Sequence, residues 1–172
     1  MIRNLQKEGG PDIIGFKRRD EVPNGMVSVR TYPLARYCIQ TVPKECPMSK
    51  SVIASEKAPK ALGPYSAGIK TGNMVFLSGQ LGMNPETGKL AEGVVAQAEQ
   101  SLTNIEALLA EAGATFDNVV KTTVLLADIA DFAAVNEVYA SKFSEPYPAR
   151  SAFAVANLPA GGLVEIEVIA AL

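Results

Sequence analysis

The stretch 93-GVVAQAEQSLTNIEALLAEAG-113 carries the clearest periodic pattern in the chain and is the starting point for predicting its fold. Its apolar residues recur at intervals of three and four, which is the spacing of one face of an α-helix. They are Val94, Val95, Ala98, Leu102, Ile105, Leu108, Leu109 and Ala112. Gly113 directly follows and suits the left-handed conformation in which many helices end. The stretch therefore predicts an amphipathic helix that ends at Gly113.

Upstream of this helix the sequence predicts a β-hairpin. Residues 67-AGIKTGNMVFLSGQLGM-83 form two apolar runs around the turn cluster Thr71-Gly72-Asn73. Apolar runs separated by such a cluster are typical of two antiparallel strands. The segment 84-NPETGK-89 then turns the chain again before the helix begins.

Downstream of the helix, strands and a second helix are predicted. Residues 119-VVKTTVLLADI-129 are rich in β-branched side chains and indicate a strand. In 130-ADFAAVNEVYASKF-143 the large apolar residues have helical spacing, and Asp128 or Asp131 can cap the start of this helix. Two final strands are predicted for 150-RSAFAVA-156 and 163-LVEIEVIAA-171.

The predicted order ββαβαββ indicates an α+β domain of two layers, in which two helices cover one face of a single sheet. The second face of that sheet is left uncovered by the chain itself. Homo-oligomerisation is the ordinary way to bury such a face, so we expect an oligomer with sites formed between subunits.

Residues 1–47 differ from the rest of the chain, because Pro and Gly are scattered through them without a sustained period. They predict a poorly ordered leader ahead of a domain over residues 48–172. The leader is an organelle-targeting segment, a tail with its own function, or sequence upstream of the true start at Met48. Four acidic residues argue against a transit peptide and favour the third interpretation: Glu8, Asp12, Asp20 and Glu21. A cytoplasmic location is therefore expected, with the mitochondrion or plastid as the alternative if the leader is a targeting segment.

Composition excludes several classes of function. The 172 residues include no histidine, which removes Ser-His-Asp and Cys-His nucleophile pairs and the usual neutral-pH base. Cys38 and Cys46 lie in no metal-binding spacing, so no metal site is expected. A net charge of −2 gives no basic field for nucleic acid, and no apolar run is long enough to span a membrane.

Charged residues in the apolar C-terminal tail are candidate functional groups. Strand alternation puts Glu165 and Glu167 on one face and Val164 and Ile166 on the other. The two carboxylates belong either to a solvated sheet face or to a site. A simple hairpin closed around residues 158–163 would bring Arg150 opposite the end of the last strand and away from Glu165, so spacing alone does not build a site here.

Several stretches resemble the Rid/YjgF family of reactive-intermediate deaminases, whose members were once described as translation inhibitors or endoribonucleases. The tail is similar to the family's C-terminal pattern in 148-PARS-151, then Phe153, Ala156 and Leu158, and 164-VEI-166. The resemblance covers roughly residues 52–172 and includes 58-APKALGPYSAGI-69, 75-VFLSGQLGMNPETG-88, 100-QSLTNIEALLAEAG-113 and 119-VVKTTVLLADIADFAAVNEVY-139. Arg150 stands where the RidA subgroup has its arginine.

The resemblance implies a chorismate-mutase-like α+β fold that assembles as a homotrimer with three clefts between subunits. It also implies hydrolysis of 2-imino acids and their 2-enamino tautomers, such as 2-iminobutyrate and 2-aminoacrylate, to 2-keto acids and ammonia, without metal or organic cofactor. A non-catalytic ligand-binding or chaperone-like trimer stays open, because a carboxylate-binding Arg150 would serve either role. The older ribonuclease label is disfavoured by the sequence pI near 5.3 and by the lack of histidine.

The residues carried over from the family fit this chemistry. The guanidinium of Arg150 can bind the substrate carboxylate through two parallel hydrogen bonds. Glu165 matches the position that holds the attacking water and moves its proton, and Glu167 is the second candidate. Four residues match positions that line the cleft, and each has a plain structural alternative at a rim, strand end or helix surface: Tyr65, Ser78, Gly79 and Asn136.

Ala152 departs from the pattern, because many bacterial relatives have cysteine two residues after the arginine. If the family uses this position through its backbone carbonyl, which would accept the imine N–H, then alanine suffices and Ala152 binds substrate. If a thiol contributed directly, this chain would lack that contribution.

Overall fold

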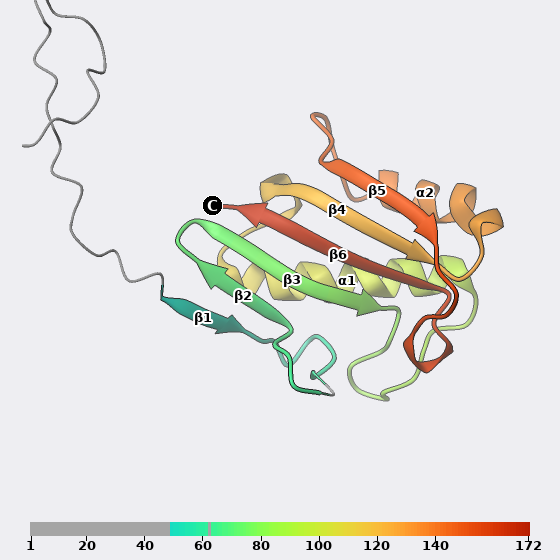
Figure 1. Cartoon of the computed structure of the whole chain (residues 1–172), viewed down its shortest axis with the longest axis horizontal. Helices are drawn as coiled ribbons and strands as arrows, with labels where there is room; N and C mark the ends of the chain where they lie inside the picture. Colours follow the sequence, from blue (N-terminus) through green and yellow to red (C-terminus); the bar gives the residue numbers. More distant parts are fainter. Residues whose placement is uncertain (1–48, 62) are drawn as a thin grey trace, which may run out of the picture. The chain divides into compact units, whose positions relative to one another are not determined.

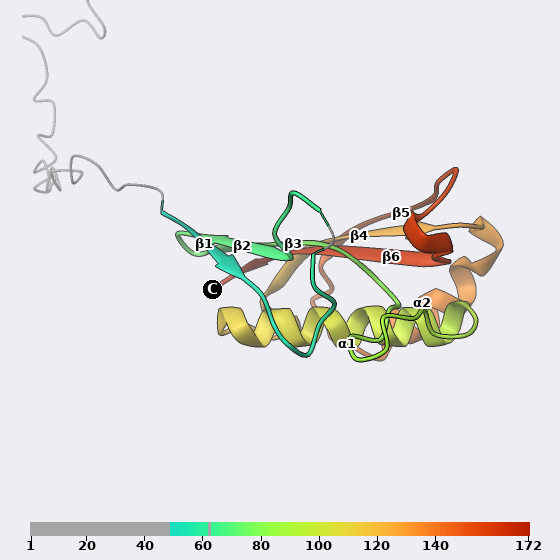
Figure 2. The same ribbon diagram turned by 90° about the horizontal axis from the view of Figure 1, so that it is seen from below.

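The computed structural model describes residues 49–61 and 63–172, and the predicted leader at residues 1–47 lies outside them. The described residues form one six-stranded sheet with two helices packed on the same side of it (Figures 1 and 2). This two-layer α+β architecture confirms the predicted fold class.

The elements follow one another as the sequence predicts, with one addition at the start. The strands are β1 (Lys50–Ile53), β2 (Gly68–Thr71), β3 (Met74–Leu81), β4 (Val119–Leu126), β5 (Ala149–Ala154) and β6 (Val164–Ala171). The helices are α1 (Val94–Ala112) and α2 (Phe132–Ala140), with short 3₁₀ turns η2 (Phe116–Asn118), η3 (Ile129–Asp131) and η4 (Pro159–Gly161). Strand β1 was not predicted, because its four residues carry too short a pattern.

The spatial order of the strands is β1-β2-β3-β6-β4-β5, so the last strand lies in the middle of the sheet (Figure 1). Only β4 and β5 run parallel among the paired strands, and the other pairs are antiparallel. The hairpin considered for the tail is wrong, because β4 separates β5 from β6. Arg150 is level with Thr122 of β4 and, through it, with Val168 of β6.

The core lies between α1 and the sheet. The predicted apolar stripe of α1 is buried there, apart from Val94, which is half-buried, and Val95, which is exposed. It packs on the inward residues of β6, and Gly113 ends the helix in the left-handed conformation as predicted. Asp128 caps η3 by accepting from the Ala130 N–H, whereas Asp131 precedes α2 without a side-chain cap.

Strand β3 contains a bulge next to the centre of the sheet. Leu77 pairs with Val168 and Gln80 pairs with Ile166, so three steps along β3 match two steps along β6. The additional residue falls at Ser78 and Gly79. Bulges of this kind re-aim side chains and are frequent beside active sites.

The sheet face opposite the helices is uncovered in the single chain (Figure 2). The alternation predicted for β6 is confirmed, because Val164, Ile166 and Val168 are buried toward α1 while Glu165 and Glu167 are not. Exposed Phe76 and Phe153 also point to the uncovered face by their register with β6 and β4. Neither of the two described helices has the length and apolar character needed to cross a bilayer.

Candidate functional site

The predicted site residues fall into two clusters in the chain. Asn136, Arg150 and Ala152 lie between α2 and β5, on the side of the sheet that carries the helices. Glu165, Gly79, Ser78 and Tyr65 lie around the bulge of β3. The first group is called the Arg150 cluster below, and the second the Glu165 cluster.

In the Arg150 cluster, α2 holds the guanidinium from one side. Arg150 Nη1 donates a hydrogen bond of 2.9 Å to Asn136 Oδ1. The guanidinium carbon also lies 4.7 Å from the ring centroid of Tyr139 and 5.5 Å from that of Phe132. A hydrogen bond and two aromatic faces orient the cation while its remaining N–H groups stay available for a ligand.

Tyr139 is itself held rigidly below Arg150. Its hydroxyl shares a hydrogen bond of 2.9 Å with the hydroxyl of Thr122, which is fully buried on β4. Its ring stacks on Phe143 at a centroid distance of 4.3 Å. Burial raises the pKa of Tyr139, although the bond to Thr122 and the charge of Arg150 oppose the shift. The phenol therefore stays neutral and serves as a fixed platform.

A hollow of about 480 Å³ opens beside this cation and is lined by Asn136, Tyr139, Ala140, Tyr147, Pro148 and Arg150. Ala152 is half-buried behind the guanidinium and packs against the core. A preoriented guanidinium in an open hollow is suited to bind an anionic group of a small molecule.

In the Glu165 cluster, the carboxylate of Glu165 packs against the backbone of Gly79. A side chain at position 79 would collide with Glu165 Oε1, so only glycine leaves room for the carboxylate here. Glu165 is level with Leu81 of β3 and Leu125 of β4 on the uncovered face. The carboxylate thus sits among apolar neighbours with a fixed backbone contact.

Burial raises the pKa of the Glu165 carboxyl, and the nearby negative charge of Glu167 raises it further. Glu167 itself is exposed two residues along the same strand face. A carboxyl with a raised pKa is a better proton acceptor when ionised and can return the proton later.

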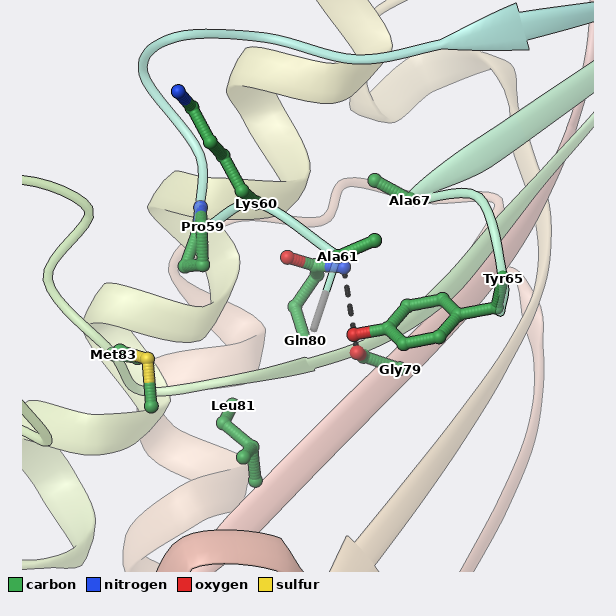
Figure 3. A pocket seen from close by; sticks show the side chains of 9 residues that line it. All are labelled: Pro59, Lys60, Ala61, Tyr65, Ala67, Gly79, Gln80, Leu81 and Met83. Carbon is green, nitrogen blue, oxygen red and sulfur yellow. Dashed lines mark hydrogen bonds between the residues drawn. The ribbon is translucent and has the colours of Figure 1, made fainter. Parts of the chain in front are cut away.

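Ser78 and Tyr65 complete this cluster through the loop before β2. Ser78 Oγ donates to the Ser66 carbonyl at 2.7 Å, and the Ser78 N–H donates to the Ala67 carbonyl at 3.0 Å. Ser78 therefore holds the loop that carries Tyr65. Figure 3 shows the Tyr65 ring reaching toward Gly79 across a small pocket of about 70 Å³ that Leu81 and Met83 also line.

The two clusters do not meet within one chain. Arg150 is on the helix side of the sheet, whereas Glu165 is on the uncovered side, and no ion pair joins them in the described part of the chain. The described residues also bring together no group of three His, Cys, Asp or Glu side chains that could hold a metal ion.

The sequence does not single out the residues that hold the two clusters in place. Phe132 and Tyr139 are two of the apolar residues at helical spacing in 130–143, and their spacing with Asn136 places all three on neighbouring positions of α2. The bulge of β3 and the buried Gln80 beside it left no comparable pattern.

A family model described as endoribonuclease L-PSP matches residues 55–172 of the chain. Reactive Intermediate Deaminase A, chloroplastic, from Arabidopsis thaliana is 55% identical over 126 residues, which are 73% of this chain and 67% of that protein. The 2-iminobutanoate/2-iminopropanoate deaminase of Capra hircus is 54% identical over 122 residues, which are 70% of this chain and 89% of that protein.

Solved structures are similar over the same region. The crystal structure of RidA from an Antarctic Psychrobacter species matches with a TM-score of 0.70 and 52% identity, covering 71% of this chain and 99% of that one. Escherichia coli TdcF, crystallised with bound serine, matches with a TM-score of 0.68 and 42% identity, covering 71% and 98%.

Proposed function

Because the chain belongs to the Rid/YjgF family, whose matching model is described as endoribonuclease L-PSP, we propose that it hydrolyses reactive 2-imino acids and their 2-enamino tautomers to 2-keto acids and ammonia. The protein is a deaminase that acts on a C=N bond, as its relatives at 50–55% identity are named for this activity. The observation that carries the proposal is the preoriented guanidinium of Arg150 in a chain of this family.

Arg150 is proposed to bind the substrate carboxylate. A 2-imino acid presents a carboxylate next to the reacting carbon, and a guanidinium binds a carboxylate through two parallel N–H···O bonds. Asn136 and Tyr139 support this role, because they hold the cation by a hydrogen bond and a ring face. The substrate is then fixed with its imine carbon at a defined distance from the cation.

Glu165 is proposed to activate water. In the protonated imine, the water oxygen bonds to the imine carbon while Glu165 accepts a proton from it, and the C=N electron pair moves to nitrogen to give a neutral carbinolamine. Glu165 then gives its proton to the amine nitrogen, the C–N bond breaks with its electron pair going to nitrogen, and ammonia leaves as the carbonyl forms and the hydroxyl proton returns to Glu165. The raised pKa of Glu165 suits both transfers.

We further propose that the working enzyme is a homotrimer whose sites combine the Arg150 cluster of one chain with the Glu165 cluster of the next. Two observations support this arrangement: the clusters lie on opposite sides of the sheet, and the uncovered face carries two large exposed apolar side chains, Phe76 and Phe153. A neighbouring chain seated on that face would bury it and bring a guanidinium to Glu165.

The activity is tested by generating 2-iminobutyrate from threonine with a dehydratase and following release of the keto acid. We expect the protein to accelerate release, and Arg150→Ala to lose about a hundredfold or more of kcat/KM because the carboxylate is no longer oriented. Arg150→Lys should recover activity only in part, since an ammonium cannot form the paired bonds. Lys142→Ala, which removes an exposed cation paired with Glu106, is the control and should behave as wild type. Normal turnover by a folded Arg150→Ala protein would refute the assignment.

The leader and the compartment are open to a separate test. The Arabidopsis relative is named chloroplastic, which supports the plastid alternative, in which residues 1–47 would be a targeting segment despite their four acidic residues. A fluorescent protein fused behind these residues should then enter plastids in plant cells, and a purely cytosolic signal would contradict this role. The domain over residues 48–172 should keep its activity and oligomeric state without the leader.

A further inference from the structure

Helix α1 carries three buried polar side chains within its apolar face. Gln97, Ser101 and Asn104 are spaced by four and three residues, so they follow one another along the same side of the helix. Their exposed fractions are 4%, 0% and 0%. Polar groups buried this deeply are costly unless each finds a hydrogen-bond partner, so their partners indicate what they do. These three residues are called the α1 polar stripe.

Two residues of the stripe bind the end of β3. Ser101 Oγ donates to the Gln80 carbonyl at 2.8 Å. Asn104 Nδ2 donates to the carbonyls of Leu81 and Met83 at 3.1 and 2.9 Å. These carbonyls directly follow the bulge, where the strand leaves its regular ladder. The stripe therefore holds the segment that carries Gly79.

The third residue of the stripe binds the start of β6. Gln97 Oε1 accepts from the Leu163 N–H at 2.8 Å, and Gln97 Nε2 donates to the Ala91 carbonyl at 3.0 Å. Leu163 lies two residues before Glu165. The same helix face is thus bonded to both segments that meet at the contact between Gly79 and Glu165.

Gln80 extends this network into the bulge itself. Its buried amide donates to the Ser78 carbonyl at 3.0 Å and to the Gly79 carbonyl at 3.3 Å, the second of which is drawn in Figure 3. Ser101 in turn holds the backbone carbonyl of Gln80. A continuous set of hydrogen bonds therefore leads from α1 through the bulge to the backbone on which Glu165 rests.

We propose that Gln97, Ser101 and Asn104 are positioning residues that hold the Glu165 carboxylate against Gly79 at the distance its proton transfers require. The proposal rests on the proposed function of Glu165. The stripe touches no reacting atom, so its effect is on the geometry of the chemical step. Apolar residues of similar size would fill the same space, but they would leave the carbonyls after the bulge without donors.

The first test is Ser101→Ala, which removes one buried hydroxyl and leaves a residue with high helix propensity. We expect kcat to fall on the order of ten- to a hundredfold, as small misplacements of catalytic groups do, with KM changed less than about twofold because the Arg150 cluster is untouched. Gln97→Met should repeat this split through β6. Thr103→Ala removes an exposed hydroxyl that bonds only within α1 and should keep wild-type kcat.

A second control distinguishes the misplacement of Glu165 from a general loss of stability. Ile105→Val trims a fully buried apolar side chain of the same helix and lowers the melting temperature without breaking a bond to β3 or β6. If the two variants lower the melting temperature by a similar amount, Ile105→Val should keep the kcat of the wild type, whereas Ser101→Ala should show the lower kcat. Equal kcat in the two variants would overturn the proposal.

Hydrogen exchange gives a readout that does not need turnover. Ser101→Ala should speed exchange of the amides in residues 78–83 and Gln97→Met that in residues 163–166, while Ile105→Val leaves both segments protected. If the wild-type protein fails to release keto acid, the proposed function is wrong, and unchanged exchange in both variants would separately show that the stripe does not hold these segments.

Discussion

A substitution at Gly79 tests the proposed role of the Glu165 carboxylate. In Gly79→Ala the new methyl group would take the place of Glu165 Oε1, so the carboxylate must move. A displacement of this size should lower kcat by about a hundredfold. Steady-state kinetics with 2-iminobutyrate would measure the loss.

Gly68→Ala is the matched control for that change. Its methyl group would meet the flexible end of Leu77 at 2.5 Å, in the core and away from Glu165. We expect a cost of about 1–3 kcal/mol in stability and an unchanged kcat. Similar losses of kcat in both glycine variants would show that Gly79 has no special relation to the carboxylate.

A second prediction for a single residue concerns Glu167 and the pH dependence of activity. Glu165 accepts a proton only when it is ionised, so activity should decline as the pH falls through its raised pKa. Glu167→Gln removes the neighbouring negative charge and thereby lowers the pKa of Glu165. The acid limb of the kcat/KM profile should move to lower pH.

Glu106→Gln serves as the comparison, because Glu106 pairs with Lys142 on the helix layer. The acid limb of the kcat/KM profile of Glu106→Gln should coincide with that of the wild type. A limb that stays in place or moves to higher pH in Glu167→Gln would mean that Glu165 does not control the profile.

At the level of elements, the contact between α2 and β5 fixes the orientation of the Arg150 guanidinium. Tyr139→Leu removes the ring face under Arg150, which is worth about 0.5–2 kcal/mol, so KM should rise by roughly two- to thirtyfold. Tyr139→Phe keeps the ring but leaves the Thr122 hydroxyl buried without its partner, at a cost of about 1–3 kcal/mol in stability. Kinetics and thermal unfolding of the pair would separate the two roles. A greater rise of KM in Tyr139→Phe than in Tyr139→Leu would contradict this division.

The helices and most of the strands could be predicted from the sequence, but their arrangement could not. Helix α1 and its end at Gly113 were predictable, because period and cap are local properties. The strands were predictable for the same reason, apart from the short β1. Strand order was not, because the insertion of β4 between β5 and β6 is decided by packing across the whole sheet.

The candidate site could likewise be predicted only in part from the sequence. Arg150 and Glu165 could be proposed from their residue types and from the family resemblance. Their separation on two sides of the sheet could not, since it depends on the order of the strands. The α1 polar stripe was also missed, because a serine or an asparagine in a helix carries no sign of burial until its partners are known.

In the whole molecule, the proposed site draws Arg150 and Glu165 from two chains. Arg150→Ala and Glu165→Gln should each be inactive alone, for different reasons: the first loses substrate orientation and the second loses the proton acceptor. A trimer that contains both variants would nevertheless form some sites from the intact Arg150 of one chain and the intact Glu165 of its neighbour.

The most direct measurement is therefore the deaminase activity of mixed trimers, purified by two different tags after co-expression of the Arg150→Ala and Glu165→Gln chains. Every mixed trimer, whichever variant is present twice, should contain about one functional site in three, because a closed ring of three chains has a single junction at which both partners are intact. Activity near a third of the wild-type value is the expected result. Mixed trimers as inactive as either variant alone would contradict a site shared between chains.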